Sequence, residues 1–188
     1  NSDSRLSYSY DQLDHVTEAT DAPVVGSPQL SAVFSYGYDV DGNRTSMVQG
    51  GTSTSYAYDS LDRLSSISDS SAGTFGYTRD SFGRIQSISR PNGINSTYTW
   101  DAADQITRIG HLRGSTVVDA ASYVYDEAGR RTKYTDNAGI HEYSYDAAGQ
   151  LTAADNPGAQ PDETYSYDPL GNRISGGHGG QVYDAANR

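Results

Sequence analysis

The chain has 188 residues, and its 24 acidic and 13 basic side chains give a formal net charge of −11. Hydrophobic residues make up 35% of it even with tyrosine counted, and the mean hydropathy is −0.69, so a dense aliphatic core is not expected. The acidic charge and the lack of a Lys/Arg cluster argue against nucleic acid as a partner, and no apolar run is long enough to span a membrane. Because cysteine is absent, disulfides and thiolate metal sites are excluded.

One short motif recurs nine times at intervals of about twenty residues, and each copy centres on an aspartate. The positions three and one before the aspartate usually both hold tyrosine, and fifteen of the sixteen tyrosines stand there. Residues two apart lie on the same face of an extended chain, so each lead-in segment is predicted to be a β-strand. In chain order the aspartates are Asp11, Asp39, Asp59, Asp80, Asp101, Asp126, Asp146, Asp168 and Asp184.

The third residue after each aspartate is of a type that tolerates a positive φ. We expect the aspartate to accept hydrogen bonds from backbone amides two or three residues on. The residue at the third position would then close a type I turn with a bulge. These positions are predicted to be hairpin turns and hold Asp14, Gly42, Asp62, Gly83, Asp104, Gly129, Gly149, Gly171 and Asn187.

A returning strand is predicted after each turn, and five of these strands begin with an aliphatic residue. Linkers of Gly, Ser, Asn and Pro, such as residues 90–93, separate the hairpins, and no stretch has sustained helical periodicity. The predicted fold class is therefore all-β, with consecutive β-hairpins in a spiralling, curved sheet. The five aliphatic residues are Val16, Leu64, Ile85, Ile106 and Leu151.

The pattern Tyr-x-Tyr-Asp-x-x-Gly-Asn/Arg, complete in residues 165–173, resembles the YD-repeat or RHS-repeat family. Members include bacterial polymorphic toxins, components of insecticidal Tc toxins, and teneurins. The resemblance implies strands that spiral into a hollow barrel or shell. In the toxin members the shell encloses a C-terminal effector domain, whereas in teneurins it carries an adhesion surface.

The predicted domain organisation is a single array of about nine repeats over residues 1–188, with an incomplete last repeat. The chain starts without a signal peptide and ends soon after Tyr183 and Asp184, so we expect it to be a fragment of a larger protein. Each hairpin would be stabilised by neighbouring repeats, because one hairpin cannot bury both of its faces.

Several residues allow a chemical interpretation beside the structural one. The aspartates could be catalytic or metal-binding, but their fixed place before a positive-φ residue favours turn formation. The tyrosine rows favour cross-strand packing over sugar stacking, and Tyr98 with Trp100 departs from the Tyr/Tyr pattern as a possible ligand-facing pair. Residues 39–43 only weakly resemble a calcium loop. We expect no catalytic residue, cofactor or metal.

Two further features of the sequence have a chemical as well as a structural interpretation. The four histidines lie far apart in the sequence and are interpreted as solvated loop or strand residues: His15, His111, His141 and His178. Asp168-Pro169 matches part of a self-cleavage motif of the family, but another repeat follows it, so Asp168 is interpreted as a turn residue.

The leading functional hypothesis is a structural, non-enzymatic shell segment of a secreted or cell-surface protein. It would enclose and help deliver a C-terminal effector domain of the same polypeptide. The alternative is a cell-surface carbohydrate-binding or adhesion module, in which aromatic side chains would face cell-surface glycans. Exposure of Trp100 and the tyrosines distinguishes the two hypotheses.

Overall fold

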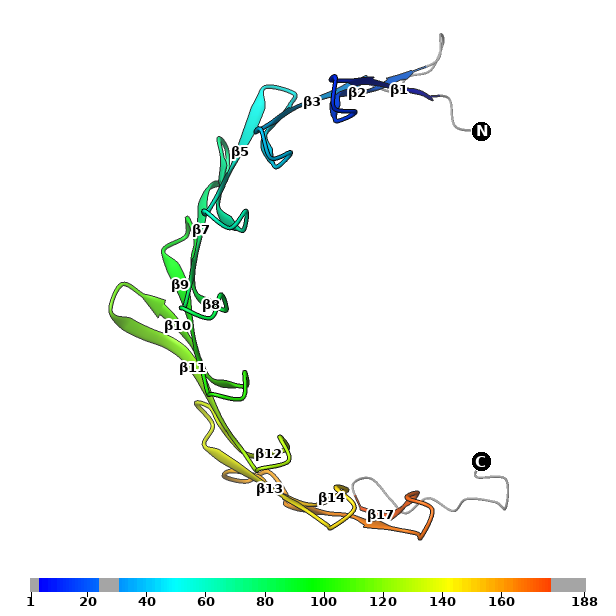
Figure 1. Ribbon diagram of the computed structural model, residues 1–188. Helices are drawn as coiled ribbons and strands as arrows, with labels where there is room; N and C mark the ends of the chain where they lie inside the picture. Colours follow the sequence, from blue (N-terminus) through cyan, green and yellow to red (C-terminus); the bar gives the residue numbers. More distant parts are fainter. Residues whose placement is uncertain (1–3, 24–30, 177–188) are drawn as a thin grey trace. The chain divides into compact units, whose positions relative to one another are not determined.

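The computed structural model describes residues 4–23 and 31–176, and every regular element within those ranges is a β-strand (Figure 1). Strands β1 to β15 follow one another in sequence order in a sheet, and β16 and β17 form a separate two-stranded sheet. The paired strands are antiparallel. The prediction of an all-β chain of consecutive hairpins is thereby confirmed.

The chain forms two compact units, Asn1–Asn95 and Ser96–Arg188. Strand β9 (Ile94–Trp100) begins in the first unit and continues in the second. The other strands of the first unit are β1 (Ser4–Tyr10), β2 (Val16–Pro23), β3 (Ala32–Tyr38), β4 (Arg44–Gln49), β5 (Thr52–Tyr58), β6 (Leu64–Asp69), β7 (Gly73–Arg79) and β8 (Ile85–Ser89). The prediction of one nine-repeat array stays a prediction, and Asp184 of the ninth repeat lies outside the described residues.

The second unit repeats the same hairpin pattern with shorter strands toward its end. Its strands after β9 are β10 (Ile106–Arg113), β11 (Thr116–Tyr125), β12 (Arg131–Thr135), β13 (Ile140–Tyr145), β14 (Leu151–Asp155), β15 (Glu163–Thr164), β16 (Ser166–Tyr167) and β17 (Arg173–Ser175). The pairing register shifts immediately before the aspartate of a turn, as the predicted bulge requires. These shifts lie at Ser9/Tyr10, Gly37/Tyr38, Ala57/Tyr58, Thr78/Arg79, Val124/Tyr125, Ser144/Tyr145 and Ser166/Tyr167.

Alternation along the strands gives the sheet two unlike faces. In the β5–β6 pair, Tyr56 lies opposite Ile67 on one face, and Ser55 lies opposite Ser68 on the other. Tyr56 is half-buried and Ser55 is exposed. One face therefore carries aromatic and aliphatic side chains, and the opposite face carries small polar ones.

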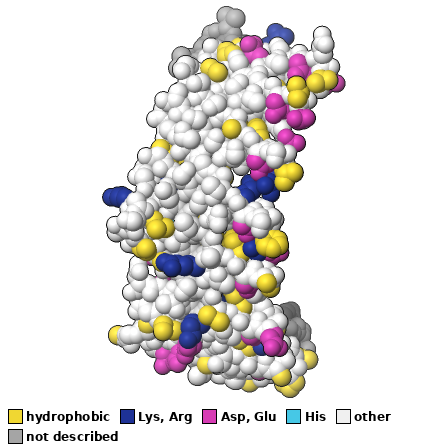
Figure 2. All heavy atoms as spheres, turned by 60° about the vertical axis from the view of Figure 1, so that its left-hand side comes forward, with side chains coloured by type: hydrophobic (Ala, Val, Ile, Leu, Met, Phe, Trp, Pro, Cys, Tyr) yellow, Lys and Arg dark blue, Asp and Glu magenta, His cyan; other side chains and the backbone are white. Residues whose placement is uncertain are grey.

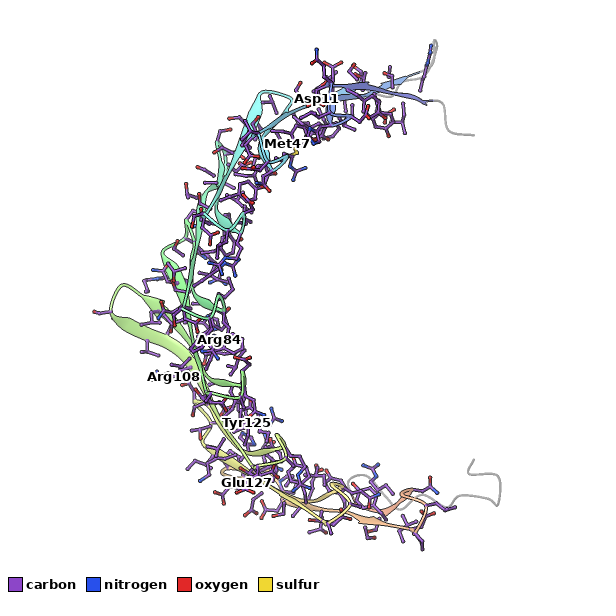
Figure 3. All side chains as sticks on the ribbon, in the orientation of Figure 1. Asp11, Met47, Arg84, Arg108, Tyr125 and Glu127 are labelled. Atoms are coloured by element: carbon purple, nitrogen blue, oxygen red, sulfur yellow. The ribbon has the colours of Figure 1, made fainter. Side chains whose placement is uncertain are left out.

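Within each unit the strands form one layer, with side chains on both of its faces (Figure 3). Among the described residues only Thr54, Ser96, Gly110 and Ala154 are buried. Figure 2 shows a face on which backbone and side chains that are neither charged nor hydrophobic predominate. The fold consequently depends on strand pairing and on contacts between neighbouring hairpins more than on a central core.

Candidate functional site

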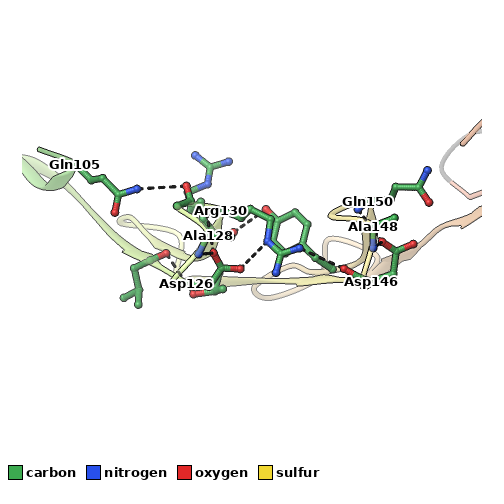
Figure 4. Close-up of polar contacts among 12 residues, drawn as sticks. Gln105, Asp126, Ala128, Arg130, Asp146, Ala148 and Gln150 are labelled. Atoms are coloured by element: carbon green, nitrogen blue, oxygen red, sulfur yellow. Dashed lines mark hydrogen bonds and ion pairs between the residues drawn. The ribbon is translucent and has the colours of Figure 1, made fainter. Parts of the chain in front are cut away.

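The aspartate turns share one hydrogen-bonding arrangement. In the turn of Asp126, the Oδ1 atom accepts the backbone amides of Ala128 at 3.0 Å and Arg130 at 2.9 Å (Figure 4). The corresponding amides, two and four residues after the aspartate, bond to Oδ1 in all eight described turns at 2.8–3.1 Å. One carboxylate oxygen thus holds both sides of each turn.

We expected the aspartate to accept amides two or three residues on, and the bond from the amide two residues on is confirmed. The third amide instead donates to the aspartate's own carbonyl, as Gly149 does to Asp146 at 3.0 Å. The β-turn therefore uses that amide, and the side chain reaches the next one. φ at the third position lies between 56° and 87° in Asp14, Gly42, Asp62, Gly83, Asp104, Gly129, Gly149 and Gly171.

The second carboxylate oxygen holds the side chain of the fourth residue after the aspartate. In three turns this residue is arginine, and its Nε donates to Oδ2 at 2.7–2.9 Å; the pairs are Arg63 with Asp59, Arg84 with Asp80, and Arg130 with Asp126. The hydrogen bond from Arg63 lowers the pKa of Asp59 to about 2, although partial burial opposes it. Each of these arginines thus forms an ion pair with the aspartate of its own turn.

The side chain at the fourth position also reaches the next turn along the sheet. Arg130 Nη1 donates to the carbonyl of Asp146 at 3.3 Å, and Gln105 Nε2 donates to the carbonyl of Gly129 at 3.4 Å (Figure 4). The turns of Asp101, Asp126 and Asp146 are therefore bonded side by side, which forms a turn ladder. Asn43 makes the same connection in another way, because its Nδ2 donates to the Asp62 carboxylate at 3.0 Å.

The ladder explains why glycine is common at the third position of the turn. A Cβ atom at Gly83 would lie 2.5 Å from Arg63 Nη1, and one at Gly171 would lie 3.0 Å from Gln150 Nε2. Glycine there provides both the positive φ and the space for the neighbouring side chain. Where the third residue is Asp62, the preceding turn presents the shorter Asn43.

The tyrosine immediately before the aspartate links its hairpin to the preceding one. Tyr145 Oη donates to the carbonyl of Arg131, the first residue of the preceding returning strand, at 2.8 Å. Partial burial raises the pKa of Tyr125, which makes an equivalent bond. Five tyrosines share this geometry at 2.8–3.0 Å: Tyr38, Tyr58, Tyr125, Tyr145 and Tyr167.

Arginines that begin returning strands stack on tyrosines of the aromatic face. The guanidinium carbon of Arg44 lies 4.6 Å from the ring centroid of Tyr56 in the next hairpin and 5.8 Å from that of Tyr36 in its own. Arg131 likewise lies 5.0 Å from the ring of Tyr143 in the next hairpin. Cation–π contacts thus join adjacent repeats on this face.

The non-standard aromatic pair, Tyr98 and Trp100, lies at alternate positions of β9, and both side chains are half-buried. A ligand-facing role for them stays a prediction. The weak calcium-like segment uses its first carboxylate within the turn, since Asp39 accepts the amides of Asp41 and Asn43 and the Asn43 side chain. Asp168 similarly accepts the amides of Leu170 and Asn172.

Three polar contacts were not anticipated from the sequence. Asp69, outside the repeated motif, accepts the Ser71 and Ala72 amides and the Thr54 hydroxyl at the opposite edge of the sheet. Hydrogen bonds, first that from the Ser71 hydroxyl, lower the Asp69 pKa. The local sequence Asp-Ser-Ser-Ala-Gly signals this turn, but the Thr54 contact depends on strand register.

The interpretation of the histidines as solvated is wrong for His141. The His141 side chain is only 15% exposed and packs against Tyr134, with ring centroids 5.1 Å apart. His111 Nδ1 lies 2.8 Å from Oγ of Ser96, which is fully buried. Cross-strand neighbours enclose these polar groups, and a serine so buried is shielded from a substrate. His178 lies outside the described residues.

A groove of about 740 Å³ lies between the adjacent turns that start at Asp101 and Asp126. Polar groups in these turns are engaged in turn and ladder hydrogen bonds. No group of three His, Asp or Glu side chains in the described ranges could hold a metal ion. The same ranges contain no helix of the length and apolarity needed to cross a membrane.

The family model described as Teneurin YD-shell matches residues 1–183. A crystal structure of TcdB2-TccC3 matches with a TM-score of 0.68 at 16% identity over 96% of this chain. TcdB2-TccC3 without its hypervariable C-terminal region matches with a TM-score of 0.66 at 17% identity over 88%. The Tc holotoxin pore of Photorhabdus luminescens gives a TM-score of 0.66 at 14% identity over 89%.

In all three structures the match covers 11% of the other chain, so this chain spans only a small part of their length. At these identities the likeness shows the fold, which is an array of hairpins of the same kind. A search of curated proteins found no match.

Proposed function

Because the chain belongs to the Teneurin YD-shell family, we propose that it is a wall segment of a shell that encloses and helps deliver a C-terminal effector domain of the same polypeptide. Its role is structural and non-catalytic. The parent protein would be secreted or displayed at the cell surface, from where it would deliver the enclosed domain.

The observation that carries this proposal is the coupling of each hairpin to the next by the same contacts. The turn ladder joins neighbours at one edge, as from Arg130 to Asp146. The tyrosine hydroxyl bonds join them on the aromatic face, as from Tyr145 to Arg131. The wall of a shell depends on bonding between successive hairpins more than on a hydrophobic core. These contacts provide that bonding in a sheet that has few buried side chains.

The name of one similar structure refers to a hypervariable C-terminal region, which is consistent with a C-terminal domain in the parent of this chain. That structure is TcdB2-TccC3 without the hypervariable C-terminal region, and another similar structure is TcdB2-TccC3-Cdc42. A constant shell followed by a variable region is the organisation that the proposal assigns to the parent of this chain. The half-buried state of Tyr98 and Trp100 gives no comparable support for glycan binding.

Limited proteolysis of the parent polypeptide, followed by intact-mass analysis, tests the proposal. We expect the domain that follows the repeats to resist protease until mild denaturant opens the wall, since a closed wall excludes the protease. Rapid digestion of that domain while the repeats stay intact would contradict enclosure.

A pair of variants makes the test specific to the turns. Gly129→Val places a β-branched side chain where φ is 79° and should lower the denaturant concentration at which protection is lost. Ala128→Val in the same turn is the matched control, because no positive φ is recorded at residue 128. Equal loss of protection in both variants would show that protection does not depend on this turn.

A further inference from the structure

The β12–β13 turn holds a histidine whose two ring nitrogens face different oxygen atoms. His141 is the second residue of β13, and its side chain is 15% exposed. Its ring packs against that of Tyr134 on β12, its register partner. His141 Nδ1 lies 3.1 Å from Asn156 Oδ1, and Nε2 lies 3.7 Å from Asp136 Oδ1. Since Asp136 follows β12 and Asn156 follows β14, the ring lies between segments from both strands that neighbour β13.

The contact with Asn156 determines which ring nitrogen carries the proton in the neutral histidine. Asn156 Nδ2 donates to the Pro161 carbonyl at 2.9 Å, so Oδ1 is the amide atom that faces the ring. An amide oxygen can only accept a hydrogen bond, so His141 Nδ1 must donate to it. A neutral imidazole has one N–H, which leaves Nε2 without a proton. The neutral ring therefore directs an unprotonated nitrogen toward the Asp136 carboxylate.

His141 Nε2 has no favourable partner while it is unprotonated. The atom is buried and has no hydrogen-bond partner among the described residues. It faces a carboxylate oxygen, which is also an acceptor, and a buried acceptor without a donor destabilises a fold. A proton on Nε2 changes this contact into a charge-assisted interaction with Asp136. In the charged ring both nitrogens are donors, and each then faces an acceptor oxygen.

Asp136 keeps its negative charge over the range in which histidine titrates. Partial burial raises the pKa of Asp136, but hydrogen bonds to its carboxylate outweigh that effect and lower the pKa. Its Oδ1 accepts the amides of Ala138 at 2.8 Å and Gly139 at 3.2 Å, and the Tyr134 hydroxyl is a further donor. The Asp136 oxygen that faces His141 is therefore the same atom that holds the turn.

The surrounding strands supply more carboxylates than cations. Arg131 of β12 lies 5.6 Å from the Tyr134 ring. Lys133 pairs with Glu142 at 2.8 Å on the opposite face of the sheet. A negative environment favours the charged form of a histidine. Further carboxylates come from β11, β14 and the segment after β14, and they are Asp119, Asp155 and Asp162.

We propose that His141 makes the β12–β13 turn responsive to pH. At mildly acidic pH the charged ring bridges Asn156 and Asp136 and so fastens the turn to the segment after β14. As the pH rises through about 5 to 8, the range in which histidine titrates, Nε2 loses its proton and the contact with Asp136 becomes unfavourable. The stabilisation is therefore present at the lower pH and is lost as the pH rises. An enclosed domain is not needed for this response, because the response concerns this turn alone.

Urea denaturation of the full chain at about pH 8 and about pH 5.5 tests the proposal. His141→Gln replaces the ring by an amide that is neutral at both pH values. We expect the substitution to raise the equilibrium constant for unfolding about fivefold more at the lower pH, which is at the upper end for an ion pair that is partly exposed. The other histidines are present in both chains, so their titration cancels in the comparison. An equal effect at both pH values would show that His141 contributes packing alone, and would overturn the proposal.

Asp136→Asn tests the partner of the charged ring. It removes the charge that faces Nε2 but keeps an oxygen for the amides of Ala138 and Gly139. In this background His141→Gln should have the same effect at both pH values. Glu127→Gln is the matched control, because it removes one negative charge from an exposed turn position of the same unit, and in its background the difference should remain. A difference that persists in Asp136→Asn would place the response elsewhere.

Nuclear magnetic resonance of the histidine ring nitrogens tests the geometry in the unaltered chain. The signals of His141 are those that disappear in His141→Gln. At the higher pH we expect a proton on Nδ1 and none on Nε2, and at the lower pH we expect a proton on both. A neutral ring with its proton on Nε2 would contradict the contact with Asn156 and overturn the proposal. This measurement holds even where a variant fails to fold, and circular dichroism spectra like that of the original chain show which variants are folded.

Discussion

The aspartate of each turn combines three bonding tasks in a single side chain. Its Oδ1 holds two amides of the turn, and Oδ2 accepts the side chain of the fourth residue in turns such as that of Asp59. Glutamate would place the carboxylate one carbon farther out, and alanine would leave both amides without this acceptor. Turn geometry thus accounts for the repeated aspartate.

The left-handed residue of the turn should be sensitive to substitution. Gly149 has a φ of 82°, and a Cβ there would lie 3.5 Å from Arg130 Nη1, so space permits a side chain and only the backbone resists it. We expect Gly149→Val to lower the free energy of unfolding by about 1 to 3 kcal/mol. Urea denaturation measures this, with Ala148→Val as the control. An unchanged free energy would contradict the proposed turn role.

The lowered carboxylate pKa values predict loss of stability in acid. The hydrogen bond from Arg63 sets the folded-state pKa of Asp59 at about 2, below the ordinary 3.8. A lowered folded-state pKa means that stabilisation is complete above the unfolded value and is lost as the pH falls toward 2. Asp126, bonded to the Arg130 amide, has a pKa lowered in the same direction. The chain should therefore unfold more readily between pH 4 and pH 2.

Thermal melts across this pH range check the prediction. Asp59→Asn removes one of the responsible groups and should flatten the fall of Tm with pH, while Asp41→Asn controls for the loss of one negative charge. Asp155 acts in the opposite sense, because repulsion from Asp162 raises its pKa and its protonation in acid favours the folded state. A Tm that rises throughout the acid range would show that this second effect dominates.

At the scale of the hairpin, local rules account for the turns, and nonlocal contacts account for their alignment. The tyrosine before the aspartate and the residue four after it each contact a neighbouring hairpin. Both contacts depend on strand pairing that places equivalent turns side by side. The period of the motif predicts which residues repeat, but it does not reveal which neighbour each side chain reaches.

The tyrosine hydroxyl bond predicts a difference between two positions of one strand. Tyr145→Phe removes the bond to the Arg131 carbonyl and should lower the free energy of unfolding by about 0.5 to 1 kcal/mol. Tyr143→Phe, two residues earlier on β13, is the matched control, because the Tyr143 ring contacts Arg131 by stacking. Chemical denaturation of both variants measures the two losses in the free energy of unfolding. Equal losses would mean that the hydroxyl bond does not couple the repeats.

At the scale of the whole chain, the small number of buried side chains affects the thermodynamics of unfolding. Only Thr54, Ser96, Gly110 and Ala154 are buried among the described residues, so unfolding exposes less apolar surface than in a globular domain. We expect the heat-capacity change of unfolding to fall below the usual value of about 12–15 cal/mol/K per residue. Differential scanning calorimetry measures it. A heat-capacity change in the usual range would show that unfolding exposes more apolar surface than a single-layer sheet would bury.

The sequence alone determined the all-β class, the position of each described aspartate turn and the two-residue alternation of tyrosines. These features arise from φ preferences and strand periodicity, which act over a few residues.

Only the tertiary structure decided the contacts that cross between hairpins. The ladder bonds from Gln105 and Arg130 were not anticipated, and His141 and Ser96 lie less exposed than their polar character suggested. Each depends on the register of neighbouring strands, which brings together residues distant in sequence. Register follows from the packing of whole hairpins, and a motif that repeats almost unchanged can be aligned in more than one way.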